Sequence, residues 1–116
     1  MNASSFDLHD DVRLDIDEAA FWYDVEFQAG AAFLDAIDAT FDRIAAAPLA
    51  FEVRRGDIRL AVVHGASEQT GPRRPAREFP YGVYFSVGND RDVTVWAVAS
   101  LVREPWYWLA RVGTQR

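Results

Sequence analysis

Arginine side chains are the residues of this sequence whose charge and spacing could bind an anion. Two local groups stand out, Arg54-Arg55 and Arg73-Arg74 with Arg77. A guanidinium group can bind a carboxylate or a phosphate through two parallel hydrogen bonds. Each group is interpreted either as a solvated face that offsets acidic residues elsewhere, or as a contact for RNA phosphates or for acidic side chains of a partner protein.

Aromatic residues near the end of the sequence form a second group that could act in binding. Trp106, Tyr107 and Trp108 are consecutive and follow Pro105. Clustered aromatic rings can make an adhesive surface for a partner protein. Alternatively, Pro105 ends a strand, and the three rings fold back over the edge of a sheet or over helices.

Composition excludes several classes of protein. Half of the 116 residues are apolar and 14% are aromatic, so the sequence is typical of one compact domain rather than of a disordered chain. With no Cys and two His, a disulfide framework, a thiolate nucleophile and a structural metal site are not expected, and no cofactor is predicted. There is neither a long apolar run nor a signal pattern, so we expect a cytoplasmic protein that does not enter a membrane.

The charge is unevenly distributed along the sequence. The formal net charge is −6, and the first 50 residues hold eleven acidic residues against two Arg, whereas residues 51–116 hold seven acidic residues against ten Arg. Proteins that bind nucleic acid without sequence preference usually present a strong positive field. The overall charge therefore argues against that function.

Hydrophobic periodicity predicts two helices in the first half of the sequence. Apolar residues recur at three- and four-residue steps over residues 11–27 and again from Phe33 to Pro48, with a break at residues 28–30. So short a break predicts an antiparallel helical hairpin. Trp22-Tyr23 and Phe33-Leu34 are interpreted as core residues, and the following acidic residues as its solvated surface: Asp15, Asp24, Asp35, Asp38 and Asp42.

The second half of the sequence is rich in β-forming residues. Strands are predicted at residues 58–63, 81–87 and 93–99, the last two joined by the turn-forming residues Gly88-Asn89-Asp90. Residues 4–8 are a candidate for a further strand, and residues 64–77 are expected to form an inserted loop. The predicted fold is a single α+β domain over residues 1–116, with an N-terminal helical hairpin packed on a small antiparallel sheet of three or four strands.

The order of these segments resembles the RelE/ParE superfamily of toxins from type II toxin–antitoxin systems. Residues 15–23 resemble the first helix of the family, residues 30–34 and 44–48 its second helix, and residues 79–84 its central strand. Residues 97–98 and 103–108 resemble its C-terminal signature. The resemblance implies a growth-inhibiting protein, of the kind also described as plasmid-stabilising, that is neutralised by a cognate antitoxin. It implies partner binding by Arg103, Trp106, Tyr107 and Trp108.

Members of this superfamily act in two ways. RelE-like members cleave mRNA on the ribosome, and ParE-like members bind DNA gyrase. If the protein is a nuclease, the resemblance implies that Arg59, Arg103 and Tyr107 carry the site. RNA cleavage also needs a base and an acid, and residues 99–102 lack the basic residues that many members carry there, with Leu101 in their place. His64 and Glu78 are possible substitutes.

Three hypotheses follow from these residues. The leading one is a ParE-like toxin that binds gyrase and is not an enzyme. The second is a RelE-like ribonuclease, and the third is a non-toxic binding module with the same fold.

Overall fold

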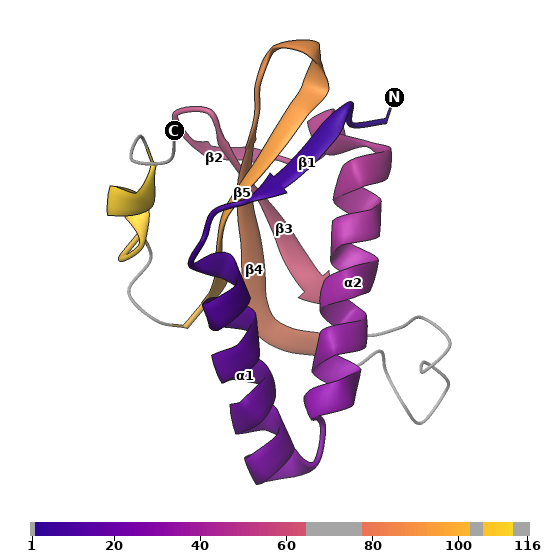
Figure 1. The fold of residues 1–116 in the computed structure, drawn as a ribbon, viewed down its shortest axis with the longest axis vertical. Helices are drawn as coiled ribbons and strands as arrows, with labels where there is room; N and C mark the ends of the chain where they lie inside the picture. The colour runs from indigo at the N-terminus through magenta and orange to yellow at the C-terminus, as the bar shows by residue number, and fades with distance from the viewer. Residues whose placement is uncertain (1, 65–77, 103–105, 113–116) are drawn as a thin grey trace.

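The computed structural model describes residues 2–64, 78–102 and 106–112. Figure 1 shows two helices side by side across one face of a twisted five-stranded sheet, whose strand order is β1-β5-β4-β3-β2. In chain order the elements are β1 (Ser5–Leu8), α1 (Val12–Phe27), α2 (Gly30–Ala46), η1 (Pro48–Ala50), β2 (Val53–Arg55), β3 (Ile58–His64), β4 (Glu78–Val87), η3 (Asn89–Arg91), β5 (Asp92–Ser100) and η4 (Leu109–Arg111).

The predicted helical hairpin is confirmed, and its tight turn has a local cause. Gln28 adopts a left-handed conformation with φ of 52°, and its N–H donates to the Asp24 carbonyl, which ends α1. Helix α2 then begins at Gly30, against the backbone of α1. A Cβ atom on Gly30 would lie 2.9 Å from the Ala20 carbonyl oxygen and 2.8 Å from Asp24 Cβ. Glycine is therefore what lets the two helices approach so closely at their junction.

The sheet differs from the prediction of three or four antiparallel strands. It has five strands and is mixed, because β1 pairs with β5 in parallel, from Ser5 opposite Asp92 to Leu8 opposite Val95. After β1 the chain forms the helical hairpin and then β2, β3 and β4, and it reaches the position beside β1 only with β5. The strand that sequence reasoning missed, β2, is three residues long, and all three residues are exposed, so it carries no alternation of buried apolar and exposed polar residues.

A β-bulge in β5 divides the apolar residues between the two faces of the sheet. The register of β4 against β5 shifts between Tyr84 and Phe85, which leaves Trp96 as the extra residue on β5. Val95 and Val98 therefore both face the helices, although three positions separate them, while Trp96 packs on the opposite face. The bulge makes the second half of β5 apolar on both faces.

Two clusters of buried residues result. The larger lies between the sheet and the helices, and its largest fully buried apolar side chains are Val12, Phe33, Ile37, Ile44, Val63, Val83, Phe85, Val93, Val95 and Val98. The smaller lies on the opposite face of the sheet and comprises Ile58, Tyr84, Trp96, Ala97, Ala99 and Trp108. The chain after β5 covers that second face.

The core prediction for the hairpin is half right. Tyr23 and Phe33 are buried and their rings stack with centroids 5.1 Å apart. Trp22 and Leu34 are exposed instead, because they fall on the flanks of their helices, outside the stripe that meets the sheet. Within the described segments, no helix is long and apolar enough to span a membrane.

Candidate functional site

The C-terminal aromatic residues differ sharply in their surroundings. Trp108 is only 2% exposed and packs on Tyr84, with ring centroids 4.8 Å apart, and on Trp106 at 5.4 Å. Tyr107 between them is exposed. Trp108 is therefore part of the core on the second face of the sheet, as the fold-back interpretation predicts for this cluster. Tyr107 remains accessible for contact with a partner.

Arginine side chains border this aromatic cluster. The Arg55 guanidinium lies over the Trp106 ring, 5.5 Å from its centroid, which is the geometry of a cation–π contact. Arg54 pairs with Glu52 at 3.2 Å on the solvated side of β2. Burial raises the pKa of the Tyr84 phenol, an effect that Arg54 opposes and Tyr107 adds to. Arg55 therefore places a positive charge beside Trp106, the chain neighbour of the exposed Tyr107.

A largely buried ion pair holds the C-terminal segment against the rest of the fold. Arg111 of η4 donates from Nη1 to Asp15 Oδ2 at 2.7 Å and from Nη2 to Asp15 Oδ1 at 3.0 Å, a two-bond contact between η4 and α1. The Asp15 side chain is 10% exposed and that of Arg111 16%. The hydrogen bond to Asp15 raises the pKa of Arg111. Asp15 was predicted to be solvated surface, and that prediction is wrong.

The same ion pair provides hydrogen-bond partners for two backbone groups at the edge of β5. Strand β1 ends at Leu8, so the next residues of β5 have no strand beside them. There Asp15 Oδ2 accepts the Val98 N–H at 3.1 Å, and Arg111 Nη1 donates to the Trp96 carbonyl at 3.1 Å. Unpaired backbone groups at a sheet edge are costly when buried. The pair therefore replaces the strand that β1 does not supply, and we name Asp15 and Arg111 the edge clamp.

The outward side of α1 carries large apolar residues that keep about half or more of their surface exposed. Leu14, Phe21, Trp22 and Val25 are all exposed, Phe21 by 71% and Val25 by 61%. Positions 14, 21 and 25 recur at helical spacing along one side, and Trp22 adjoins them. We name these four residues the outer α1 face. Single exposed apolar residues are common in soluble proteins, whereas several on one side of a single helix are typical of an interaction surface.

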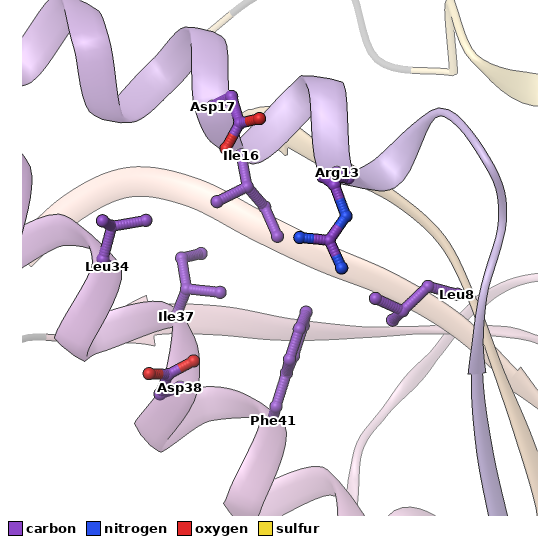
Figure 2. Close-up of a pocket in the computed structure, with 8 residues that line it drawn as sticks. All are labelled: Leu8, Arg13, Ile16, Asp17, Leu34, Ile37, Asp38 and Phe41. Atoms are coloured by element: carbon purple, nitrogen blue, oxygen red, sulfur yellow. The ribbon is translucent and has the colours of Figure 1, made fainter.

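A cleft lies between α1, α2 and the end of β1, and Figure 2 shows the residues that line it. Its volume is about 250 Å³. Apolar side chains form its floor and charged side chains its rim, and we name it the hairpin cleft, lined by Leu8, Arg13, Ile16, Asp17, Leu34, Ile37, Asp38 and Phe41.

The predicted nuclease residues are not assembled into one described site. Arg59 Nη1 donates to the Phe51 carbonyl at 2.6 Å and to the Leu49 carbonyl at 3.4 Å, so its guanidinium fastens the segment between α2 and β2. Arg103 lies outside the described residues, as do residues 65–77 of the predicted inserted loop. His64 and Glu78 are opposite each other in the β3–β4 register, at the end of that ladder.

The described residues form no cluster suited to a metal ion. Among them no group of three or more His, Asp or Glu residues is placed to coordinate a metal ion.

The edge clamp and the outer α1 face were both missed from the sequence. The helical spacing of Leu14, Phe21 and Val25 was a signal for the latter, but nothing in the sequence links residue 15 to residue 111.

In comparisons with known proteins, no protein-family model and no curated protein sequence matches the chain.

Proposed function

We propose that this protein is a growth-inhibiting toxin of a toxin–antitoxin pair that acts by binding a protein target, DNA gyrase in the ParE-like mode. The observation that carries the proposal is the outer α1 face, where Leu14, Phe21, Trp22 and Val25 present apolar side chains to solvent. An apolar helix face of this kind suits a protein partner. The RelE/ParE-like order of segments supplies the class of activity.

The surroundings of Arg59 favour protein binding over catalysis. A phosphate clamp needs a guanidinium group directed at the ligand, and Arg59 in β3 directs both N–H groups of its Nη1 to the backbone carbonyls of Leu49 and Phe51. The exposed Tyr107 beside Arg55 and Trp106 fits a partner contact with or without catalysis. A cognate antitoxin is the expected second partner, and it would cover part of the same apolar surface.

A ribonuclease is the second candidate because of one specific arrangement. His64 and Glu78, which come from different strands, are opposite each other in the register of β3 and β4. An imidazole and a carboxyl group are the types of side chain that can act as base and acid when a 2′-hydroxyl attacks a phosphate. This candidate predicts that His64→Ala abolishes the activity, and the protein-binding proposal predicts that it does not.

Induced expression in bacteria tests the proposal, with DNA breaks and mRNA cut sites measured separately. We expect DNA breaks without new mRNA cut sites. Phe21→Ser combined with Val25→Ser should restore growth at an unchanged protein level, because both side chains are exposed and their replacement leaves the core intact. Leu49→Ser is the control: it removes an apolar side chain of η1 that is 57% exposed, close to the 61% of Val25, and should leave growth inhibited.

Other outcomes of this experiment select between the hypotheses. Cut mRNA, with rescue by His64→Ala, would replace the proposal with the ribonuclease. Arg103→Ala should restore growth under either mechanism, since the resemblance places Arg103 in the partner-binding signature. If the unmutated protein does not inhibit growth, the proposal is wrong and the non-toxic binding module takes its place.

A further inference from the structure

We propose that the hairpin cleft binds a peptide segment of another protein in which one large apolar side chain stands between an acidic and a basic residue. The cleft and the outer α1 face lie on different sides of α1, so this is a second site. The inference stands whether or not the protein inhibits growth.

The size of the cleft indicates what enters it. Its volume of about 250 Å³ is below the range of roughly 300–1,000 Å³ typical of pockets for small molecules and cofactors. It exceeds the space of a few water molecules, which occupy about 30 Å³ each in the liquid. The floor, which includes Ile16, Ile37 and Phe41, is apolar. One or two apolar side chains of a protein partner fit these limits.

One end of the rim is positive. Arg13 is the second residue of α1, where the helix dipole disfavours a cation and favours an acidic residue. Figure 2 shows its side chain extending from α1 toward Phe41 and Leu8, beside the apolar floor. In the described part of the chain Arg13 is exposed and no ion pair or hydrogen bond engages its guanidinium. A cation kept in an unfavourable position without an internal partner is suited to an external carboxylate.

The other end of the rim is negative. Asp17 lies one turn after Arg13 on α1, and Asp38 projects from α2 on the opposite side of the cleft (Figure 2). Both are exposed, and no ion pair among the described residues neutralises either. Two carboxylates on facing helices repel each other, and a basic side chain placed between them would relieve that repulsion. The charge of the rim therefore changes along the cleft, from positive near β1 to negative nearer the junction of the two helices.

This direction defines the order of charges in the ligand. Arg13 and Asp17 are four residues apart on α1, a rise of about 6 Å. Two side chains on one face of an extended peptide are separated by about 6.8 Å when they are two residues apart, and a helical peptide covers 6 Å in four residues. The residue between two residues on one face of an extended peptide points away from the cleft, so a helical ligand fits best, with its acidic and basic residues three or four positions apart and the apolar anchor between them.

Selection from a displayed library of short random peptides on the intact protein tests this inference. We expect enriched peptides to carry an acidic residue, a large apolar residue and a basic residue at the stated spacing. Leu34→Ser should weaken their binding by about tenfold, the effect typical of an anchor contact. Leu14→Ser is the matched control, because it changes an exposed leucine of the outer α1 face, and it should change the affinity by less than about twofold.

A variant with exchanged charges gives the decisive comparison. Arg13→Asp combined with Asp17→Arg reverses the charge order along α1 at exposed positions, and circular dichroism verifies that it folds. Selection on this variant should enrich peptides with the acidic and basic residues exchanged. The inference is overturned if no peptide is enriched, if both proteins enrich the same charge order, or if binding responds to Leu14→Ser and not to Leu34→Ser. None of these results affects the growth experiment, so the two proposals fail independently.

Discussion

Loss of the edge clamp should destabilise the protein far more than loss of a surface ion pair. Arg111→Ala removes two hydrogen bonds to Asp15, at 2.7 Å and 3.0 Å, and one to the Trp96 carbonyl at 3.1 Å. Asp15, 10% exposed, is then left with the Val98 N–H as its remaining contact in the clamp. Removing one partner of a fully buried pair costs about 3–5 kcal/mol, and an exposed pair contributes about 0–1 kcal/mol.

Because the edge clamp is largely buried, the expected loss of stability lies near the range for buried pairs rather than the range for exposed pairs. We expect Arg111→Ala to lower the free energy of unfolding by about 3 kcal/mol, a large part of the roughly 5–15 kcal/mol that holds a typical domain folded. Urea unfolding followed by far-ultraviolet circular dichroism measures this loss. Arg111→Lys should recover only part of it, because an ammonium group cannot make the two parallel bonds to Asp15.

A double-mutant cycle separates the ion pair from other effects of the substitutions. The coupling energy between Asp15→Ala and Arg111→Ala should be about 2 kcal/mol. The matched control is the cycle for Glu52 and Arg54, whose atoms are 3.2 Å apart but whose side chains are 74% and 49% exposed. That coupling should stay below about 0.5 kcal/mol. Equal coupling energies in the two cycles would refute the conclusion that burial makes the edge clamp strong.

Two further predictions concern stability. Because burial raises the pKa of Tyr84, the folded protein holds the phenol proton more tightly than the unfolded chain does, so the free energy of unfolding should fall as the pH rises above about 10. Urea titrations at several alkaline pH values should show a smaller fall for Tyr84→Phe. A fall of the same size in the variant would contradict this prediction. Gly30→Ala should cost about 1–3 kcal/mol, because its Cβ would lie 2.8 Å from Asp24 Cβ and 2.9 Å from the Ala20 carbonyl oxygen. Gly88→Ala, whose Cβ would have no neighbour nearer than 3.8 Å, is the control and should melt like the unmutated protein.

Local patterns were sufficient to predict most of the elements. The two helices follow from apolar spacing, and β3, β4 and β5 follow from runs of β-branched and aromatic residues, each within a few residues of the observed bounds. Strand β2 was not predicted because Val53, Arg54 and Arg55 are all exposed, and the strand is defined by its pairing with β3. The parallel pairing of β1 could not be predicted, since it depends on how the chain returns to β5.

Features that depend on residues distant in the sequence were the least predictable. Asp15 is one of five acidic residues on the hairpin that look alike by spacing, and only its contact with Arg111 and the Val98 N–H distinguishes it. The bulge at Trp96 likewise changes which face each residue of β5 occupies, so strict alternation would have placed Val98 away from the helices. In both cases long-range packing decided what a local pattern left open.

The pairing of β1 with β5 constrains how the protein can fold during synthesis. Ser5 hydrogen-bonds Asp92, 87 residues away, and the β1–β5 ladder starts at the same two residues. Strand β1 therefore has no partner until β5 has been synthesised, whereas α1 and α2 can pack on each other early. A nascent chain that stops before β5 leaves its helices without Val93 and Val95 to pack on. Completion of the sheet thus waits for the synthesis of β5, and the order of synthesis leaves the edge of β1 unpaired until then.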